Sequence, residues 1–264
     1  NLNKIMIDIH SHILPGVDDG AKNIQESIIM IKNAFKADTK IIVATPHLLN
    51  GMFETGIPKR NTLVSDLQAI ADNIGIKIQI KQGYECYISP EMNRLGEKLF
   101  EYTINNNKKY ILLELPMQNI PHFVDETLNN IKNLGIIPII AHPERNTAIM
   151  NNPNILLGFI EKGYSTQLNA GSILGYYGKQ VKDTAKILLK HNYIHVVASD
   201  MHSISFPILP KAFSTISNLI GLNKSSRMFN EIPYKIVMGE DFDREDTIPY
   251  ISKKGSLIKR IFRI

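Results

Sequence analysis

The sequence predicts an α/β fold: a distorted (β/α)7 TIM-like barrel with a metal site at the C-terminal ends of its strands. Seven short apolar segments, rich in Ile and Val, are typical of buried parallel strands. Successive segments begin 26–38 residues apart, which is about the length of one strand with its crossover helix and loops. The predicted strands are residues 5–12, 40–47, 78–85, 110–116, 136–145, 164–170 and 194–202. A barrel of this size fits one domain, which we assign to residues 1–252.

The segments between these strands have the pattern of amphipathic helices. In residues 25–37 and 123–134, apolar side chains recur at a spacing near 3.6 residues, which gathers them on one helical face. The same alternation of strand and helix continues along the chain. The predicted helices are residues 25–37, 60–74, 91–100, 123–134, 154–162, 179–191 and 209–220.

Six of the seven predicted strands end in a residue that can bind a metal ion. The C-terminal ends of parallel strands gather on one face of a barrel, so these side chains are expected to converge there. Only the strand at 164–170 has no such residue. The candidate ligands, in chain order, are His10, His12, His47, Glu85, Glu114, His142, Asp200 and His202.

A single His at a strand end is more often a hydrogen-bonded packing residue than a ligand. The spacing of His10 with His12, and of Asp200 with His202, favours ligands, because residues i and i+2 of a strand point to the same side. We interpret His122, His191 and His195, which lie in helices or at strand starts, as structural.

The candidate ligands offer nitrogen and oxygen but no thiolate, which favours Mn²⁺, with Fe²⁺ or Zn²⁺ as alternatives. Eight ligands are too many for one ion, so we expect two to three divalent ions, with Glu85 or Glu114 as a bridge. Such clusters generate hydroxide at neutral pH and stabilise an in-line phosphoryl displacement. Arg145, three residues after His142, is placed to bind a phosphate oxygen, although a solvent-facing arginine is the simpler alternative.

Composition excludes several classes of protein. Hydrophobic residues make up 44% and charged residues 21%, which suits a folded domain with a sizeable core. No apolar stretch reaches the roughly 18 residues of a membrane span. The single cysteine, Cys86, rules out an internal disulfide and favours a reducing, cytoplasmic location. Six residues after Cys86 stands Met92, so the cysteine–arginine pair of thiol-dependent tyrosine phosphatases is absent and Cys86 is interpreted as a buried small hydrophobe.

The net charge of +5 belongs to the end of the chain. Residues 253–264 contain five Lys and Arg and no acid, so residues 1–252 are formally neutral and have no basic field for nucleic acid. Cations and large apolar residues alternate in this tail, as in helices that lie on an anionic membrane or a partner. The alternative is a terminal helix packed on the barrel.

Together these segments resemble the polymerase and histidinol phosphatase (PHP) superfamily, and within it the bacterial metal-dependent protein-tyrosine phosphatases of capsule and exopolysaccharide loci. The resemblance covers residues 5 to about 220. It lies in DIHSHILPGVDDGA (8–21), ATPH (44–47), GYECY (83–87), LLELP (112–116), IIPIIAHPERN (137–146), QLNAGSILGYYGK (167–179) and ASDMHS (198–203).

The resemblance implies up to three metal ions held by the eight candidate ligands, with Arg145 and Asp19 assisting at the phosphate. It also implies hydrolysis of phosphotyrosine by direct attack of a hydroxide generated at the metals. The implied partner is a membrane-anchored bacterial tyrosine kinase that controls polysaccharide export.

Two positions depart from the family pattern. Relatives often have a second His where this chain has Leu48, and an Arg shortly after the position of His202, where this chain has none until Arg227. Lys211 could substitute there as a point charge without a guanidinium fork.

The sequence is also compatible with other functions. The same superfamily includes histidinol-phosphate phosphatase, and a nucleotide phosphodiesterase would use similar ligands. A non-catalytic metal-binding module is a third alternative, although the intact set of eight ligands argues against it. An amidohydrolase also begins with His-x-His but would be expected to have a lysine near Glu114.

Overall fold

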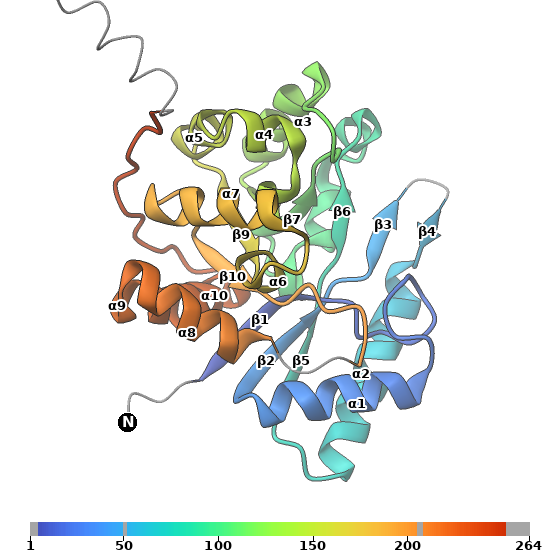
Figure 1. Cartoon of the computed structure of the whole chain (residues 1–264). Coiled ribbons are helices and arrows are strands. Elements are labelled where there is room, and N and C mark those ends of the chain that lie inside the picture. Colours follow the sequence, from blue (N-terminus) through green and yellow to red (C-terminus); the bar gives the residue numbers. More distant parts are fainter. Residues whose placement is uncertain (1–4, 50–51, 205–207, 252–264) are drawn as a thin grey trace, which may run out of the picture.

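The structure is a computed structural model that describes residues 5–49, 52–204 and 208–251, so the basic tail predicted at 253–264 lies outside the described residues. Its strands form two sheets that are parallel except for one hairpin, β3–β4 (Figure 1). One sheet has the order β1-β2-β5 and the other β10-β9-β8-β7-β6-β3-β4. The strands are β1 (Met6–Ser11), β2 (Thr39–Ala44), β3 (His47–Leu49), β4 (Phe53–Glu54), β5 (Gln79–Gln82), β6 (Glu85–Tyr87), β7 (Tyr110–Glu114), β8 (Ile137–Ala141), β9 (Ser165–Asn169) and β10 (Val196–Ala198).

Two of the seven predicted strands are each broken into two. The segment at 40–47 gives β2 and β3, and the segment at 78–85 gives β5 and β6. The breaks fall at Pro46, which has no N–H for a ladder, and at Gly83, whose N–H bonds to Ala44 O at 2.9 Å. Each break carries the chain from the three-stranded sheet into the seven-stranded sheet, where His47 and Glu85 stand opposite each other in register.

The two sheets enclose one interior, as the predicted barrel requires. A shared apolar cluster contains Ile9 and Val43 from the smaller sheet, Leu112 and Ile139 from the larger one, and Ile236 from helix α10 (Ile232–Met238). Between β10 and β1 the described residues form one isolated bridge, Ser11–Met201, rather than a ladder. The α/β prediction is confirmed, and the barrel is distorted to the extent that its ladders do not close.

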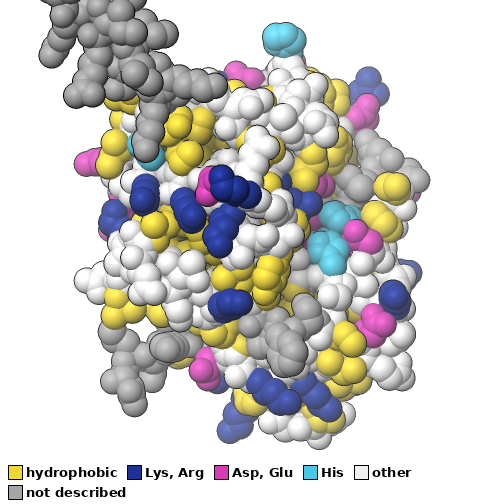
Figure 2. All heavy atoms as spheres, in the orientation of Figure 1, with side chains coloured by type: hydrophobic (Ala, Val, Ile, Leu, Met, Phe, Trp, Pro, Cys, Tyr) yellow, Lys and Arg dark blue, Asp and Glu magenta, His cyan; other side chains and the backbone are white. Residues whose placement is uncertain are grey.

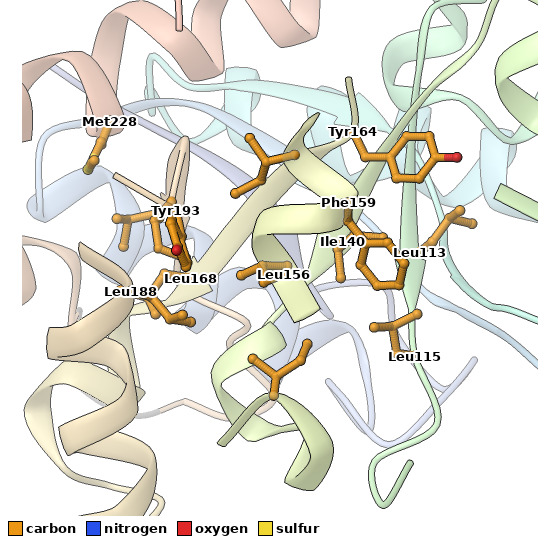
Figure 3. Close-up of a cluster of buried hydrophobic side chains, with 14 of the residues drawn as sticks. Leu113, Leu115, Ile140, Leu156, Phe159, Tyr164, Leu168, Leu188, Tyr193 and Met228 are labelled. Atoms are coloured by element: carbon orange, nitrogen blue, oxygen red, sulfur yellow. The ribbon is translucent and has the colours of Figure 1, made fainter. Parts of the chain in front are cut away.

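Helices cover the outside of this ring (Figure 1). The second core lies between the larger sheet and these helices, where Leu113 and Ile140 pack against Leu156, Phe159 and others (Figure 3). Burial of each such side chain stabilises the fold by about 1.5–3 kcal/mol. The helices are α1 (Ile24–Lys36), α2 (Ile57–Asn73), α3 (His122–Asn133), α4 (Thr147–Asn151), α5 (Asn154–Glu161), α6 (Ala170–Leu174), α7 (Lys179–Lys190), α8 (Leu209–Ile220), α9 (Leu222–Ser226) and α10.

Six of the seven predicted helices lie within three residues of their predicted bounds. The prediction at 91–100 is wrong in type, because this segment forms two 3₁₀ helices, η1 (Pro90–Arg94) and η2 (Gly96–Tyr102). Gly96 has a φ of +52°, which a continuous α-helix does not allow. Further short helical turns are η3 (Ile104–Asn106), η4 (Pro143–Arg145) and the π-helical η5 (Arg227–Glu231).

Within the described ranges, no helix combines the length and apolar character needed to cross a bilayer. Cys86 is buried, and burial raises the pKa of its thiol, which confirms its interpretation as a small hydrophobe. His191 donates from Nδ1 to Ile248 O at 2.7 Å, and His195 Nδ1 lies 2.8 Å from Thr166 Oγ1, so both have structural partners.

His195 is expected to make stability depend on pH. Burial, followed by the nearby Arg244, lowers the pKa of His195 to about 3. An unfolded His has a pKa near 6.5, so the unfolded chain binds the proton first as pH falls. The stability that depends on a neutral His195 is therefore fully present above pH 6.5 and is lost progressively toward pH 3. Between pH 7.5 and 5 it should lower the free energy of unfolding by about 2 kcal/mol.

Denaturant unfolding of the wild type and of His195→Gln at these two pH values measures this contribution. The variant should lose less stability than the wild type on acidification, whatever its stability at pH 7.5. An equal loss in both proteins would contradict the assignment.

Candidate metal centre

The strand ends bring all eight predicted ligands to one end of the barrel. His10 is in β1 and His12 follows it; His47 and Glu85 open β3 and β6, just beyond the ends of β2 and β5. Glu114 is the last residue of β7, His142 follows β8, and Asp200 and His202 follow β10. The convergence expected from parallel topology is therefore found.

The innermost group is a cage of two imidazoles and two carboxylates, all buried: His10, His12, Glu85 and Asp200. His10 Nε2 lies 3.1 Å from Glu85 Oε2 and 3.2 Å from Asp200 Oδ1. His12 Nε2 lies 3.3 Å and 3.5 Å from the same two oxygens. Four donor atoms thus surround one point.

A second group opens to solvent and contains His12, Asp19, His47 and His202. Asp19 Oδ1 lies 3.4 Å from His47 Nε2 and 3.3 Å from His202 Nε2. The Asp19 side chain is 58% exposed and that of His202 31%. Histidine side chains beside an acidic one are visible on the right of the space-filling view (Figure 2). Asp19, expected beside the phosphate, is thus grouped with the potential ligands.

The third group joins His47, Glu85 and Glu114. Glu85 belongs to this group and to the inner cage, which is the arrangement expected of a bridging carboxylate. His142 is the one predicted ligand outside the three groups. Its Nε2 nevertheless lies 2.8 Å from Glu85 Oε1 and 3.8 Å from Glu114 Oε1.

The donor atoms fit a divalent cation. Glu85 Oε2, Asp200 Oδ1 and His47 Nδ1 are buried and have no hydrogen-bond partner among the described residues. His10 Nε2 and His12 Nε2 face each other at 3.2 Å. Buried polar atoms are normally satisfied, so such atoms aimed at one point indicate a ligand position. Nitrogen and oxygen donors without thiolate suit Mn²⁺, Fe²⁺ or Zn²⁺.

The electrostatics of the cage favour positive charge. Burial by itself lowers the pKa of His10, but Glu85 and Asp200 outweigh burial and raise it to about 9. Burial by itself raises the pKa of the Asp200 carboxyl, but His10 and His12 outweigh burial and lower this pKa below its usual value, so the group is anionic. Two buried carboxylates of this kind hold a proton on the imidazoles or a metal cation between them.

Two side chains that sequence reasoning missed hold the inner histidines in place. Asp18 Oδ2 accepts from His12 Nδ1 at 2.8 Å, and Gln167 Oε1 accepts from His10 Nδ1 at 2.9 Å. Each bond keeps the proton of the neutral imidazole on Nδ1 and directs Nε2 at the cage, so that Nε2 can bind a metal ion, as is usual for metal-ligating histidines. Gln167 comes from the strand at 164–170, which has no ligand. Its buried polar sequence, Ser-Thr-Gln-Leu-Asn, was the available signal.

Backbone conformation also directs the ligands. His142 and Asp200 have φ values of +31° and +52°, in the left-handed region that costs an L-residue of order 1–3 kcal/mol. The loop after β1 folds back so closely that a Cβ at Gly20 would lie 2.1 Å from His12 O. Only glycine fits there, which explains the glycine in the Val17–Ala21 segment.

A cavity of about 600 Å³ leads to the ligand cluster. Besides candidate ligands, its lining includes Met117, Arg145, Tyr176, Tyr177 and Ile208. Arg145 Nη1 lies 3.4 Å from Asp200 Oδ2, at the edge of the cluster. Lys211 is exposed on α8 and is not among the residues that line this cavity. Leu48 lies beside a different cavity.

Comparisons with known proteins show what the chain is similar to over most of its length. The chain matches the family described as "Capsular polysaccharide synthesis, CpsB/CapC" over residues 6–238. It is 35% identical over 231 residues to tyrosine-protein phosphatase YwqE of Bacillus subtilis, covering 88% of each chain. It is 34% identical over 243 residues to tyrosine-protein phosphatase CpsB of Streptococcus pneumoniae, covering 89% of this chain and 99% of the relative.

Solved structures give the same relationship. A structure from a study of YwqE and CpsB, described as unique metal-dependent tyrosine phosphatases, superposes with a TM-score of 0.86 at 31% identity, covering 94% of this chain and 100% of the other. Histidinol phosphate phosphatase from Lactococcus lactis superposes with a TM-score of 0.57 at 14% identity, a likeness of fold alone. The resemblance drawn from the motifs is confirmed. Because the family match runs from β1 to α10 and includes every predicted ligand, this chain belongs to the CpsB/CapC family of capsular polysaccharide synthesis.

Proposed function

We propose that this protein is a metal-dependent protein-tyrosine phosphatase with two to three divalent ions, Mn²⁺ in preference to Fe²⁺ or Zn²⁺. The observation that carries the proposal is the cluster of three overlapping ligand groups at the base of an open cavity. Relatives that share about a third of its residues are tyrosine-protein phosphatases.

We assign the metals to the eight predicted ligands and add Asp19 at the solvent-facing group. When bound, divalent ions make hydroxide available at neutral pH and neutralise charge on a transferring phosphoryl group. Arg145 lies at the cavity wall with its guanidinium beside Asp200, where it can bind a phosphoryl oxygen. Asp18 and Gln167 orient His12 and His10.

A protein substrate suits this site better than a small metabolite. The Asp19 side chain is 58% exposed and Tyr176 is 60% exposed, so the entrance is bordered by accessible side chains. We propose phosphotyrosine on a membrane-anchored bacterial tyrosine kinase linked to capsule or exopolysaccharide production as the physiological substrate.

Turnover of a phosphotyrosine peptide, compared with histidinol phosphate and a nucleotide phosphodiester, tests the function. The chelated protein should be inactive, and restored Mn²⁺ should give a kcat/KM for the peptide at least about tenfold above that for the other two substrates. Faster turnover of histidinol phosphate would favour the metabolite phosphatase instead. No turnover of any substrate with any of the three metals would favour a non-catalytic module.

We also propose that the basic tail, residues 253–264, brings the enzyme to an anionic surface near its substrate. Each Lys or Arg near such a surface contributes roughly 1 kcal/mol. A chain that ends at residue 252 should keep its turnover of a soluble peptide but bind anionic vesicles more weakly, and added salt should reduce the difference. A fall in melting temperature with unchanged vesicle binding would instead indicate a tail packed on the barrel.

A further inference from the structure

The segment that follows β9 contributes Tyr176 and Tyr177 to the wall of the cavity that leads to the candidate ligands. It forms α6, then turns at Gly175, whose φ is +91°, and returns so that Tyr176 N bonds to Gly171 O at 2.9 Å. This turn places the ring of Tyr177 against the guanidinium of Arg145, with Cζ 4.6 Å from the ring centroid. The side chain of Asn169 also interacts with the Tyr177 hydroxyl.

Among the described residues, the other polar contact of the Arg145 side chain is with Asp200. Its Nη1 lies 3.4 Å from Asp200 Oδ2, which is long for a charge-assisted hydrogen bond, and its side chain is 26% exposed. An arginine held so loosely loses conformational entropy when it binds phosphate. The flat face of Tyr177 restricts the guanidinium before substrate arrives, and a cation over an aromatic ring is attracted to it.

The backbones that carry Arg145 and Tyr177 are also tied together. Glu144, the residue before Arg145, is buried and its Oε1 accepts hydrogen bonds from Asn169 N at 3.0 Å and Ser172 Oγ at 2.6 Å. These two donors flank Gly171. These hydrogen bonds fix the position of the turn η4 relative to the start of α6. The contact between the Tyr177 ring and the Arg145 guanidinium adds a side-chain link between the same two segments.

Gly171 provides an independent observation. A Cβ at this position would lie 3.0 Å from Tyr177 Cε2 and 3.4 Å from Tyr176 Cδ2. Gly171 lies inside α6 with no left-handed φ, so its backbone does not require glycine. Glycine in a helix is otherwise unfavourable relative to alanine. Because Gly171 has no side chain, the Tyr177 ring can pack closely against its backbone.

We propose that Tyr177 is a positioning residue that holds Arg145 in its phosphate-binding orientation, and that Gly171 leaves the space this requires. The inference rests on the proposed function, because it assigns Tyr177 a role through Arg145. It explains two residues of the segment QLNAGSILGYYGK that the ligand set leaves unexplained.

The first test compares Tyr177→Leu with Tyr177→Phe in the metal-loaded full chain. Tyr177→Leu should lower kcat/KM for a phosphotyrosine peptide by about 3- to 30-fold. It should also raise the inhibition constant of inorganic phosphate, because the same arginine binds both. Tyr177→Phe keeps the ring and should stay within about threefold of the wild type. Metal content should be normal in both. The side-chain amide of Asn169 also donates to Asp200 Oδ2. A loss of bound metal in Tyr177→Leu would therefore overturn the proposal, because it would mean that Tyr177 acts on Asp200 through Asn169.

The second test uses Gly171→Ala, with Gly158→Ala as the matched control. Gly158 also lies inside a helix, α5, and a Cβ there meets nothing within 4 Å. Gly158→Ala should keep wild-type activity, whereas Gly171→Ala should lose activity without losing thermal stability. In a Tyr177→Leu background, Gly171→Ala should have no further effect, since the ring it displaces is gone. Additive losses in the double variant would overturn the proposed route.

Arg145→Ala separates this inference from the proposed function. Wild-type kcat/KM in Arg145→Ala would mean that the arginine does not bind phosphate. The proposed role of Tyr177 would then be wrong as well, because it acts through Arg145. A large loss in Arg145→Ala, with wild-type values in both Tyr177→Leu and Gly171→Ala, would overturn the role of Tyr177 alone.

Discussion

Asp200→Ala is expected to abolish phosphatase activity, with a fall in kcat/KM on the order of a thousandfold or more. Asp200 Oδ1 is buried, has no hydrogen-bond partner among the described residues and lies 3.2 Å from His10 Nε2. Its removal takes one anion and one donor atom from the inner cage. His10→Ala should have the same effect because it removes the facing imidazole. The loss should appear both in turnover of a phosphotyrosine peptide and in the metal bound per chain after dialysis.

Cys86→Ser is the control for this prediction. Cys86 is next to Glu85 in the chain but packs in the second core, between the larger sheet and the helices, and burial raises the pKa of its thiol. A thiol that remains protonated is a poor nucleophile. Most activity should therefore survive the substitution. Loss of turnover in a Cys86→Ser protein that folds and binds metal normally would rule out the metal-dependent mechanism.

The second large effect is expected at Arg145. Loss of a bidentate, charge-assisted contact to a transferring phosphoryl group should reduce transition-state stabilisation by about 2–4 kcal/mol, or roughly 30- to 1000-fold in kcat/KM. Arg145→Lys should be nearly as damaging as Arg145→Ala, because an ammonium cannot reproduce the fork or its stacking on Tyr177.

Metal content distinguishes this effect from damage to the metal centre. Arg145 lies outside the three ligand groups, so both variants should bind metal as the wild type does. Steady-state kinetics on a phosphotyrosine peptide, together with metal analysis of the same samples, is the measurement. A wild-type kcat/KM in Arg145→Ala would show the residue to be a surface arginine without a role in phosphate binding.

Some features of the site were open to prediction because they depend on position along a strand. His10 in β1 and His12 just after it are two residues apart, and their Nε2 atoms lie 3.2 Å apart. His47 and Glu85, from two consecutive predicted strands, stand opposite each other in register. Parallel topology brings such strand ends together whatever the details of packing. Asp19 was expected at the phosphate, and its contacts with His47 and His202 could not be predicted from the order of residues in the chain.

The amino-acid sequence alone was enough to predict the alternation of most strands and helices, the end of the barrel at which the candidate ligands gather, and the lack of the cysteine–arginine pair of thiol-dependent phosphatases. These follow from local periodicity, strand geometry and residue type. Three other features are visible only in the folded chain: Asp18 and Gln167 hold the inner histidines, two strands break at Pro46 and Gly83, and Tyr177 lies on Arg145. These features depend on contacts between residues up to 157 positions apart, which no local pattern specifies. They arise because a buried polar atom must find its partner from whichever segment the packed fold brings beside it.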